Sequence, residues 1–551
     1  MVVSAERLAS EAGADILRAG GNAVDAAVAV GYALAVVDPC CGNIGGGGFM
    51  VLHRASGGEL FLNFRETAPA AATPDMYLDA QGHVVGGASL YGWRAVAVPG
   101  TVLGLDTALR RWGTLPRARV MAAAIRLARD GFVVGSSQAE LWSRFAPLLR
   151  ADRDVARVFL RPDGTPLQAG DRVTQPALAE TLAAIAAEGP DAFYRGRIPQ
   201  AVAAAAQAGG GIITAADFAR YKVTEGAPIG CDFHGWHVVS AAPPSSGGVT
   251  LCEILNILAG YDLRATGFHS AASVHVMAEA MRQAYADRNT ELGDPDFVHV
   301  PVARLLSPEY AAELRARIGP RATPSRDLTA ATPPHEHAET THYSVMDAAG
   351  NAVAVTYTLN GAFGAGVMAP GAGFLLNDEM DDFTSKPGTP NMFGLVQGAA
   401  NAIAPGKRPL SSMAPTIVLR GSAVALVLGS PGGARIITTV LEAMLNATTF
   451  GLAPQEAVDA PRFHEQWLPD LLFAEPHAFS ADTEATLHGM GYAIATQSPW
   501  GAVEMIAVGD AFAAKGPPSS GNDAAAGGML RPGRLYGASD PRRPAGAAVG
   551  E

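Results

Sequence analysis

The sequence predicts an α+β fold, in which helices and antiparallel strands form separate layers. Two pairs of alternating strands are present, Phe49–His53 with Leu60–Phe64 and His342–Met346 with Ala352–Leu359. A short turn of glycine or polar residues joins the two strands of each pair, and residues 100–330 have mostly helical patterns. Because the strands come as hairpins and not as regular βαβ units, a layered α+β arrangement is favoured.

The beginning of the chain predicts two helices. Residues Ala5–Leu17 have helical spacing, Gly20–Asn22 interrupt it, and Ala23–Val37 resume it. The second stretch is apolar on nearly every side, which indicates a buried helix. It is shorter than the roughly 20 residues needed to cross a membrane and it contains Asp25, so no membrane span is expected. It also lacks the basic leader and cleavage site of a signal peptide, which leaves a cytoplasmic protein or one whose export signal is missing.

Further elements follow along the chain. The clearest helical patterns in the middle are Val120–Asp130, Leu178–Glu188, Pro199–Gln207 and Ser273–Asp287. Residues 321–338 suggest an exposed linker, and residues 511–530 suggest a low-complexity loop. A strand at Val424–Leu428 leads through a glycine-rich run into a helix at Ala434–Asn446.

Composition argues against a nucleic-acid partner and against a structural zinc site. Acidic residues outnumber basic ones, 52 to 40, and no cluster of Lys and Arg is present, so nucleic acid is not an expected partner. The four cysteines include no Cys-x-x-Cys pair, so a structural zinc site is not expected either.

The run Glu339-Thr340-Thr341 stands where the linker meets a strand. A threonine hydroxyl is a weak nucleophile unless a base takes its proton, and a threonine at a chain terminus has its own α-amino group as that base. Thr340 gains such an amine only if the bond after Glu339 is cut, which its own hydroxyl can begin by attacking the Glu339 carbonyl. The alternative is that two β-favouring threonines simply begin a strand.

The run Gly429–Gly433 (GSPGG) lies between a strand and a helix. Two glycines there expose adjacent backbone N–H groups near a helix N-terminus, where partial positive charge accumulates. Gly432 and Gly433 are therefore candidates for an oxyanion hole. The alternative is an ordinary turn in which Ser430 caps the helix.

Charged and hydroxyl residues mark three further candidate segments. The acidic run Asn377–Asp382 suits a substrate ammonium group or a metal, although its spacing does not match a calcium loop. The hydroxyls of Lys407–Met413 suit a phosphate or carboxylate. Arg65 ends a hairpin strand. The alternative for the acidic run is a solvated turn, and for Lys407–Met413 it is a surface loop. The alternative for Arg65 is a surface ion-pair partner.

Taken together and in this order, these motifs resemble the γ-glutamyltranspeptidases, or glutathione hydrolase precursors, of bacteria. The resemblance runs nearly end to end. The matching segments are Gly21–Ala27, Gly45–Phe49, Phe64–Pro69, Pro244–Gly248, Thr340–Ser344, Thr356–Asn360, Met380–Phe383, Pro409–Met413, Gly429–Gly433 and Tyr536–Arg542.

The resemblance implies a role for each candidate residue. Thr340 is the expected nucleophile, Thr358 its hydrogen-bonding neighbour, and the N–H groups of Gly432 and Gly433 the oxyanion hole. The residues expected to hold the substrate α-carboxylate are Arg65, Ser411 and Ser412. Those expected to hold its α-ammonium are Asn360, Glu379 and Asp382. An Arg fork suits a carboxylate, and carboxylates suit an ammonium.

The resemblance also implies a four-layer αββα sandwich of the N-terminal nucleophile hydrolase type. Cleavage divides it into a large subunit, residues 1–339, and a small subunit, residues 340–551, which form a heterodimer around one shared core. It implies glutathione and other γ-glutamyl compounds as substrates, amino acids or dipeptides as acceptors, no metal or organic cofactor, and export to the periplasm or medium.

One departure and two rivals accompany this interpretation. Residues Pro387–Leu395 match a loop that covers the site in relatives, but Phe393 stands where bacterial relatives carry Tyr, which predicts a looser lid. One rival is an acylase of the same fold for glutaryl or β-lactam amides, which needs no ammonium-binding residues. The other is an unprocessed binding protein without catalytic activity.

Overall fold

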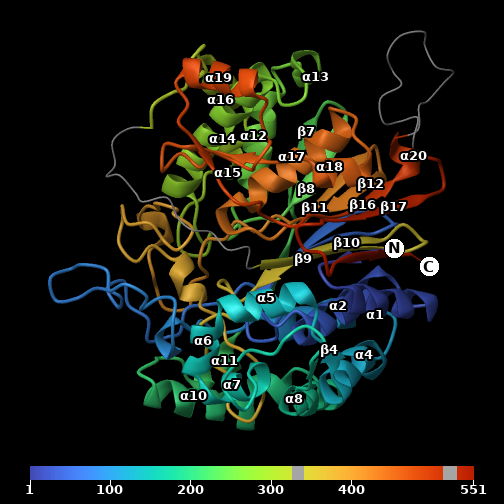
Figure 1. Cartoon of the computed structure of the whole chain (residues 1–551), viewed down its shortest axis with the longest axis vertical. Coiled ribbons are helices and arrows are strands. Elements are labelled where there is room, and N and C mark those ends of the chain that lie inside the picture. The colour runs from blue at the N-terminus through green and yellow to red at the C-terminus, as the bar shows by residue number, and fades with distance from the viewer. Residues whose placement is uncertain (326–339, 513–529, 551) are drawn as a thin grey trace.

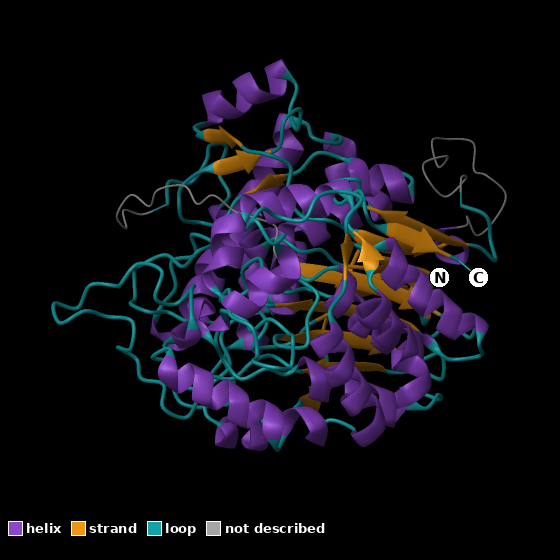
Figure 2. Cartoon of the chain, turned by 60° about the horizontal axis from the view of Figure 1, so that its bottom comes forward, coloured by secondary structure: helices purple, strands orange, loops and turns teal. Residues whose placement is uncertain are grey.

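The computed structural model describes residues 1–325, 340–512 and 530–550, and two β-sheets packed face to face form its centre (Figure 1). Helices cover the outer face of each sheet, and the second view in Figure 2 shows helices outside both sheets again. This arrangement is the expected α+β fold, a four-layer αββα sandwich. The predicted linker falls largely on residues 326–339, and most of the predicted low-complexity loop on 513–529, both outside the described residues.

The first sheet carries the two predicted hairpins. Its strand order is β18 (Ala547–Val549), β1 (Val2–Ser4), β9 (Thr340–Met346), β10 (Ala352–Thr358), β2 (Gly47–His53), β3 (Glu59–Asn63) and β6 (Thr224–Gly226). All of these neighbours pair antiparallel. Strand β9 begins two residues before the predicted His342, so Thr340 itself belongs to the sheet.

The second sheet has the order β17 (Leu535–Ser539), β16 (Glu504–Val508), β12 (Ala423–Leu428), β11 (Thr416–Arg420), β8 (Trp236–Ser240) and β7 (Ile229–Phe233). The middle of the chain is mostly helical, as predicted, but the hairpin of β7 and β8 within it was not predicted. A disulfide joins Cys231 of β7 to Cys252 in helix α12 (Gly247–Leu258), which covers this sheet.

One helical layer packs on the first sheet. It includes α1 (Arg7–Arg18), α2 (Ala23–Val37), α3 (Thr101–Trp112), α4 (Arg117–Asp130) and α8 (Pro176–Glu188). Helix α2 has the predicted bounds, and every one of its residues is buried. The Asn22 side chain caps its first turn while Asp25 bonds back to the Asn22 amide, a capping box that fixes where the helix begins.

The other helical layer packs on the second sheet and includes α12, α14 (Ala271–Glu291) and α17 (Ile436–Thr448). Helix α17 begins two residues later than predicted, because Gly433–Arg435 form a 3₁₀ turn before it. The remaining helices are α5 (Ser136–Arg144), α6 (Ala146–Ala151), α7 (Arg153–Phe159), α9 (Asp191–Tyr194), α10 (Arg197–Ala208), α11 (Ala215–Arg220), α13 (Leu263–Thr266), α15 (Val302–Leu305), α16 (Pro308–Arg317), α18 (Pro454–Asp459), α19 (Ala481–Met490) and α20 (Gly509–Phe512). The short strands are β4 (Phe132–Val133), β5 (Arg172–Val173), β13 (Phe463–His464), β14 (Leu472–Ala474) and β15 (Ile494–Thr496).

Both central sheets contain strands from before and after position 340. In the first sheet, β9 and β10 lie between β1 and β2, and in the second sheet β11 pairs with β8. Among the described residues, none of the helices combines the length and the apolar character that a membrane crossing requires.

Candidate active site

Thr340 begins β9 and lies directly opposite Thr358 on β10. Its hydroxyl donates a hydrogen bond to the Thr358 hydroxyl, with 3.3 Å between the two oxygens. The backbone N–H of Asn360 donates to the same Thr358 oxygen at 2.9 Å. Thr340 therefore lies at the start of an inner strand of the sheet, with its oxygen oriented by the neighbouring strand. Glu339, the other side of the predicted cleavage point, lies outside the described residues.

A small cavity beside Thr340 brings together most of the predicted site residues. Its volume is about 20 Å³, close to the room that one water needs. Its lining includes Thr340, Thr358, Arg65, Asn360, Glu379, Asp382, Ser411, Ser412 and Gly433. Gly432 is adjacent in sequence but does not line the cavity. Phe393 and Leu395 of the predicted lid close one side.

The glycine-rich run reaches the cavity through Gly433. Gly432 has φ +133° and Gly433 has φ +53°, conformations that glycine adopts without steric cost. A Cβ on Gly433 would also lie 2.3 Å from the Phe393 ring. Ser430 does not cap α17, since its hydroxyl donates to the Pro431 carbonyl and accepts from the Ala502 amide. The alternative of an ordinary capped turn is therefore wrong.

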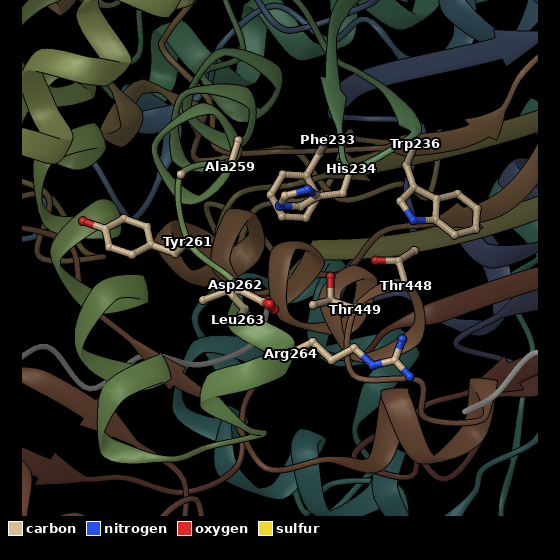
Figure 3. A pocket seen from close by; sticks show the side chains of 11 residues that line it. Phe233, His234, Trp236, Ala259, Tyr261, Asp262, Leu263, Arg264, Thr448 and Thr449 are labelled. Carbon is tan, nitrogen blue, oxygen red and sulfur yellow. The ribbon is translucent and has the colours of Figure 1, made fainter. Parts of the chain in front are cut away.

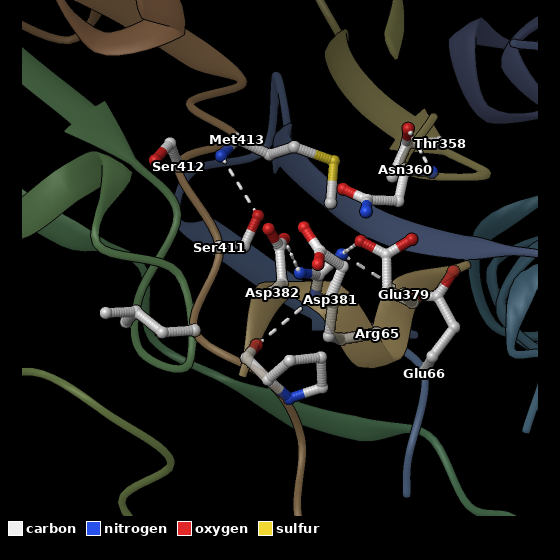
Figure 4. Close-up of polar contacts among 12 residues, drawn as sticks. Arg65, Glu66, Thr358, Asn360, Glu379, Asp381, Asp382, Ser411, Ser412 and Met413 are labelled. Carbon is white, nitrogen blue, oxygen red and sulfur yellow. Dashed lines mark hydrogen bonds and ion pairs between the residues drawn. The ribbon is translucent and has the colours of Figure 1, made fainter. Parts of the chain in front are cut away.

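The acidic run is buried, and two of its carboxylates contact Arg65 (Figure 4). The Arg65 guanidinium donates to Glu379, and its Nη2 lies 2.5 Å from the Asp382 carboxylate. Glu66 lies 3.5 Å away. The side chains of Arg65 and Glu379 have no exposed surface, so the alternatives of a solvated acidic turn and a surface ion pair are both wrong.

Three carboxyl groups share the charge of Arg65. Burial raises the pKa of Glu379 and Asp382, although the nearby guanidinium opposes the shift. Burial likewise raises the pKa of Glu66 to about 7. One guanidinium does not neutralise three carboxylates, so the cluster favours either a retained proton or a second cation, such as a substrate ammonium group.

Ser411 and Ser412, from a buried segment, line the same cavity as the acidic cluster. The Ser411 hydroxyl accepts from the Met413 amide at 3.1 Å, and the Ser412 hydroxyl accepts from Arg288 at 2.8 Å. Because each oxygen already accepts a bond, each hydroxyl proton is available to an anion in the cavity. The alternative of a surface loop is wrong, because residues 407–413 are buried.

The Asn360 side chain completes the polar lining. Its backbone has a positive φ of 79°, which asparagine tolerates better than most residues. Its amide nitrogen donates to the Asp378 carbonyl at 3.2 Å, an orientation fixed by the segment that carries Glu379.

The sequence did not single out two charged residues of this region. Glu66 was part of a matching motif but had no role assigned. Arg288 lies on α14, one residue beyond the predicted helix end at Asp287. The sequence feature that could have identified Arg288 is its spacing, three positions after Tyr285 and seven after Met281. This spacing places a charged residue on the buried face of the helix.

A second cavity, of about 480 Å³, lies elsewhere, between the β7–β8 turn and helices α13 and α17 (Figure 3). Its lining includes Phe233, Trp236, Tyr261 and Arg264, and it shares no residue with the cavity at Thr340. The larger cavity contains none of the predicted site residues, whereas the small cavity brings a candidate nucleophile together with charged groups.

Known proteins share both the sequence and the fold. The family model described as gamma-glutamyltranspeptidase matches residues 9–550. The glutathione hydrolase proenzyme of Pseudomonas sp. (strain A14) is 52% identical over 100% of this chain and 94% of its own length. That of Escherichia coli (strain K12) is 47% identical over 98% and 90%. The cephalosporin acylase from Bacillus halodurans has a similar crystal structure, with a TM-score of 0.82 and 28% identity over 99% of this chain and 94% of its own.

Proposed function

Because the chain belongs to the γ-glutamyltranspeptidase family, we propose that it cleaves itself before Thr340 and then transfers γ-glutamyl groups from glutathione and related compounds. The chain is thus an enzyme made as a proenzyme, a γ-glutamyltransferase and glutathione hydrolase that matures into a heterodimer. The observation that carries the proposed mechanism is the cavity in which Thr340 meets both an acidic cluster and a pair of serine hydroxyls.

Self-cleavage begins when the Thr340 hydroxyl attacks the Glu339 carbonyl carbon. The peptide nitrogen takes the hydroxyl proton and leaves as the α-amine of Thr340, and Glu339 is held as an ester. Water then opens the ester, which releases Glu339 as a carboxylate and restores the Thr340 hydroxyl. Thr358 orients the attacking oxygen through the 3.3 Å hydrogen bond. The new amine, with a reference pKa of roughly 7.7–8.0, becomes the base for the following reaction.

A γ-glutamyl group has an ammonium and a carboxylate on the same carbon, and the cavity offers a complement to each. Glu379 and Asp382, with Asn360, receive the ammonium, while Arg65, Ser411 and Ser412 receive the carboxylate. Binding at this end places the γ-carbonyl carbon against the Thr340 hydroxyl.

The acyl transfer then follows in two steps. The Thr340 amine takes the hydroxyl proton as the oxygen attacks the γ-carbonyl, and the backbone N–H groups of Gly432 and Gly433 stabilise the oxyanion. The leaving amine takes the proton and departs. Water or an acceptor amine attacks the γ-glutamyl ester next, which regenerates Thr340.

The charge of the cavity disfavours the acylase alternative. A glutaryl group lacks the ammonium, so it leaves the buried carboxyls of Glu66, Glu379 and Asp382 without the additional cation. We expect faster hydrolysis of glutathione than of a glutaryl amide, and the opposite preference would support the acylase.

Intact mass and N-terminal sequencing of the purified protein test the proposal. We expect two chains, one of which starts at Thr340, and release of glutamate from glutathione. Thr340→Ala should remain a single chain of 56.7 kDa without activity. A folded wild-type protein that stays in one piece but hydrolyses glutathione would contradict the mechanism, and one that stays whole and inactive would support the binding-protein alternative.

We also propose that amino acids or dipeptides serve as acceptors, since their amines can replace water in attack on the ester. Glycylglycine should accelerate the release of p-nitroaniline from γ-glutamyl-p-nitroanilide and yield a γ-glutamyl tripeptide. Loss of acceleration with N-acetylated glycylglycine is the control, because it has no free amine.

Finally, we propose that the protein acts in the periplasm or outside the cell. The disulfide between Cys231 and Cys252 supports this, because such bonds persist in oxidising compartments. Fractionation of the native host should place the activity in the periplasm or medium, and recovery with cytoplasmic markers would contradict the proposal.

A further inference from the structure

Arg288 lies behind the serine pair in a fully neutral set of hydrogen bonds. Its guanidinium donates to the side-chain oxygens of Ser246 (3.0 Å), Asn289 (2.8 Å), Gln397 (3.4 Å) and Ser412 (2.8 Å). The side chain is buried, with 1% of the residue exposed. Among the described residues, no carboxylate oxygen lies within 4.0 Å of it, unlike Arg65, which contacts three acidic residues.

The charge of Arg288 is retained despite its burial. Burial lowers the pKa of Arg288 to about 10, with a smaller contribution from Arg65, although Tyr285 and the more distant Asp382 carboxylate oppose the shift. The group is therefore still cationic at neutral pH. A buried cation without a paired anion costs free energy, and an anion that arrives close by reduces this cost. The cavity is therefore polarised, with an excess of carboxyls on one side and an unpaired cation behind the serines.

The hydrogen bonds of Arg288 also hold Ser412 by its hydroxyl and, through Ser246, Ser411 by its carbonyl. Its Nη2 donates to the Ser412 oxygen, so the Ser412 proton must point elsewhere. Its Nε donates to the Ser246 oxygen, and the Ser246 hydroxyl in turn donates to the Ser411 carbonyl at 2.6 Å. One side chain of α14 thereby fixes the segment that carries both serines, across the predicted division between the subunits.

We propose that Arg288 is a positioning residue for the substrate α-carboxylate. It acts through Ser412, by holding the hydroxyl as a donor toward the cavity and by placing a positive charge behind it. This role rests on the proposed function, because it requires a substrate with a carboxylate at that end.

Three p-nitroanilides separate this role from a merely structural one. The γ-glutamyl compound has both charged groups, the 4-aminobutanoyl compound lacks the carboxylate, and the glutaryl compound lacks the ammonium. For Arg288→Gln we expect KM for the γ-glutamyl compound to rise about 10- to 100-fold, with a similar fall in kcat/KM for the glutaryl compound. The kcat/KM for the 4-aminobutanoyl compound, followed at high enzyme concentration, should stay within about twofold.

Two further variants serve as matched comparisons. Arg288→Lys keeps the charge and should restore part of the lost affinity. Arg282→Lys alters another buried arginine of α14, whose partners are Glu279 and Asp470, and should leave the preference among the three compounds unchanged. Equal losses for all three compounds in Arg288→Gln, or losses no larger than in Arg282→Lys, would overturn the proposal.

A double-mutant cycle keeps the test decisive if Arg288→Gln does not fold. If Arg288 acts through Ser412, the double variant Arg288→Lys/Ser412→Ala raises KM by less than the product of the two single increases. A rise equal to that product would overturn the role. A wild-type protein that releases no p-nitroaniline from the γ-glutamyl compound instead contradicts the proposed function itself.

Discussion

The Thr340 hydroxyl lies 3.3 Å from the Thr358 hydroxyl because the two residues are paired directly across β9 and β10. The proposed nucleophile is thus oriented by strand register, because the pairing of β9 with β10 fixes which residue lies opposite Thr340.

Thr358→Val should slow self-cleavage. The substitution keeps the shape of the side chain but removes the oxygen that receives the Thr340 hydroxyl, and we expect about a 10-fold lower rate of processing. The conversion of one band into two, followed by electrophoresis during expression and refolding, measures that rate. Thr358→Ser keeps the hydroxyl and should process at a rate closer to wild type. Equal rates for the Val and Ser variants would exclude a role for the hydrogen bond.

Asp382→Asn should weaken the preference for substrates with an α-ammonium group. The change removes one carboxylate from the cluster around Arg65 but keeps its size, so KM for γ-glutamyl-p-nitroanilide should rise about 10- to 100-fold. The glutaryl compound has no ammonium and should lose much less, or gain. An equal change in kcat/KM for both compounds would show that Asp382 does not bind the ammonium.

Phe393→Tyr should tighten the lid over the cavity. Phe393 is buried at the cavity wall, and its ring packs against Gly433. An added hydroxyl that finds a partner contributes about 0.5–1.5 kcal/mol, so the ratio of hydrolysis to transfer should fall by roughly 2- to 10-fold. That ratio, measured with glycylglycine as acceptor, tests the looser lid predicted for the wild type. No change in the ratio counts against it.

His342 should make the protein less stable in acid. It is buried on β9 between Thr356 and Ser344, and burial lowers its pKa to about 3 from 6.5. Between these values the unfolded chain binds the proton and the folded chain does not, so the free energy of unfolding rises with pH by up to about 1.4 kcal/mol per unit.

The comparison of His342→Gln with the wild type isolates this contribution. Urea denaturation at several pH values between 4 and 6.5 should give a shallower pH dependence for the variant, by the slope of one proton. His464→Gln is a parallel test and should reduce the slope by a similar amount, because burial also lowers the pKa of His464 to about 3. An unchanged slope in His342→Gln would mean that His342 is protonated in the folded protein.

Local features of the structure were predictable from the sequence. Helix α2 begins and ends at the predicted residues, because the Asn22 cap and an unbroken apolar run act within the segment itself. Alternating residues likewise predicted the hairpins of β2 with β3 and β9 with β10. The hairpin of β7 and β8 was missed, although Ile229, Cys231 and Phe233 alternate with Gly230 and Asp232. Its place in the sheet depends on pairing with β11, a segment distant in the sequence.

The candidate site was predicted by residue identity, but its electrostatics were not. Motifs pointed to Thr340, Arg65, Glu379 and Asp382, yet each charged segment alone was equally compatible with a solvated surface. Burial decides between the two, and burial depends on which segments pack together. Arg288 illustrates this, since its contact with Ser412 joins residues 124 positions apart.

The sequence by itself therefore determined the order of the elements, the candidate nucleophile and the chemical types of the groups around it. Those properties depend on neighbouring residues and on intrinsic reactivity. Only the tertiary structure decided that three carboxyls share one guanidinium and that a second buried cation lies behind the serines. A charge interacts with everything within several ångströms of it, whatever the separation along the chain, and folding alone brings those groups together.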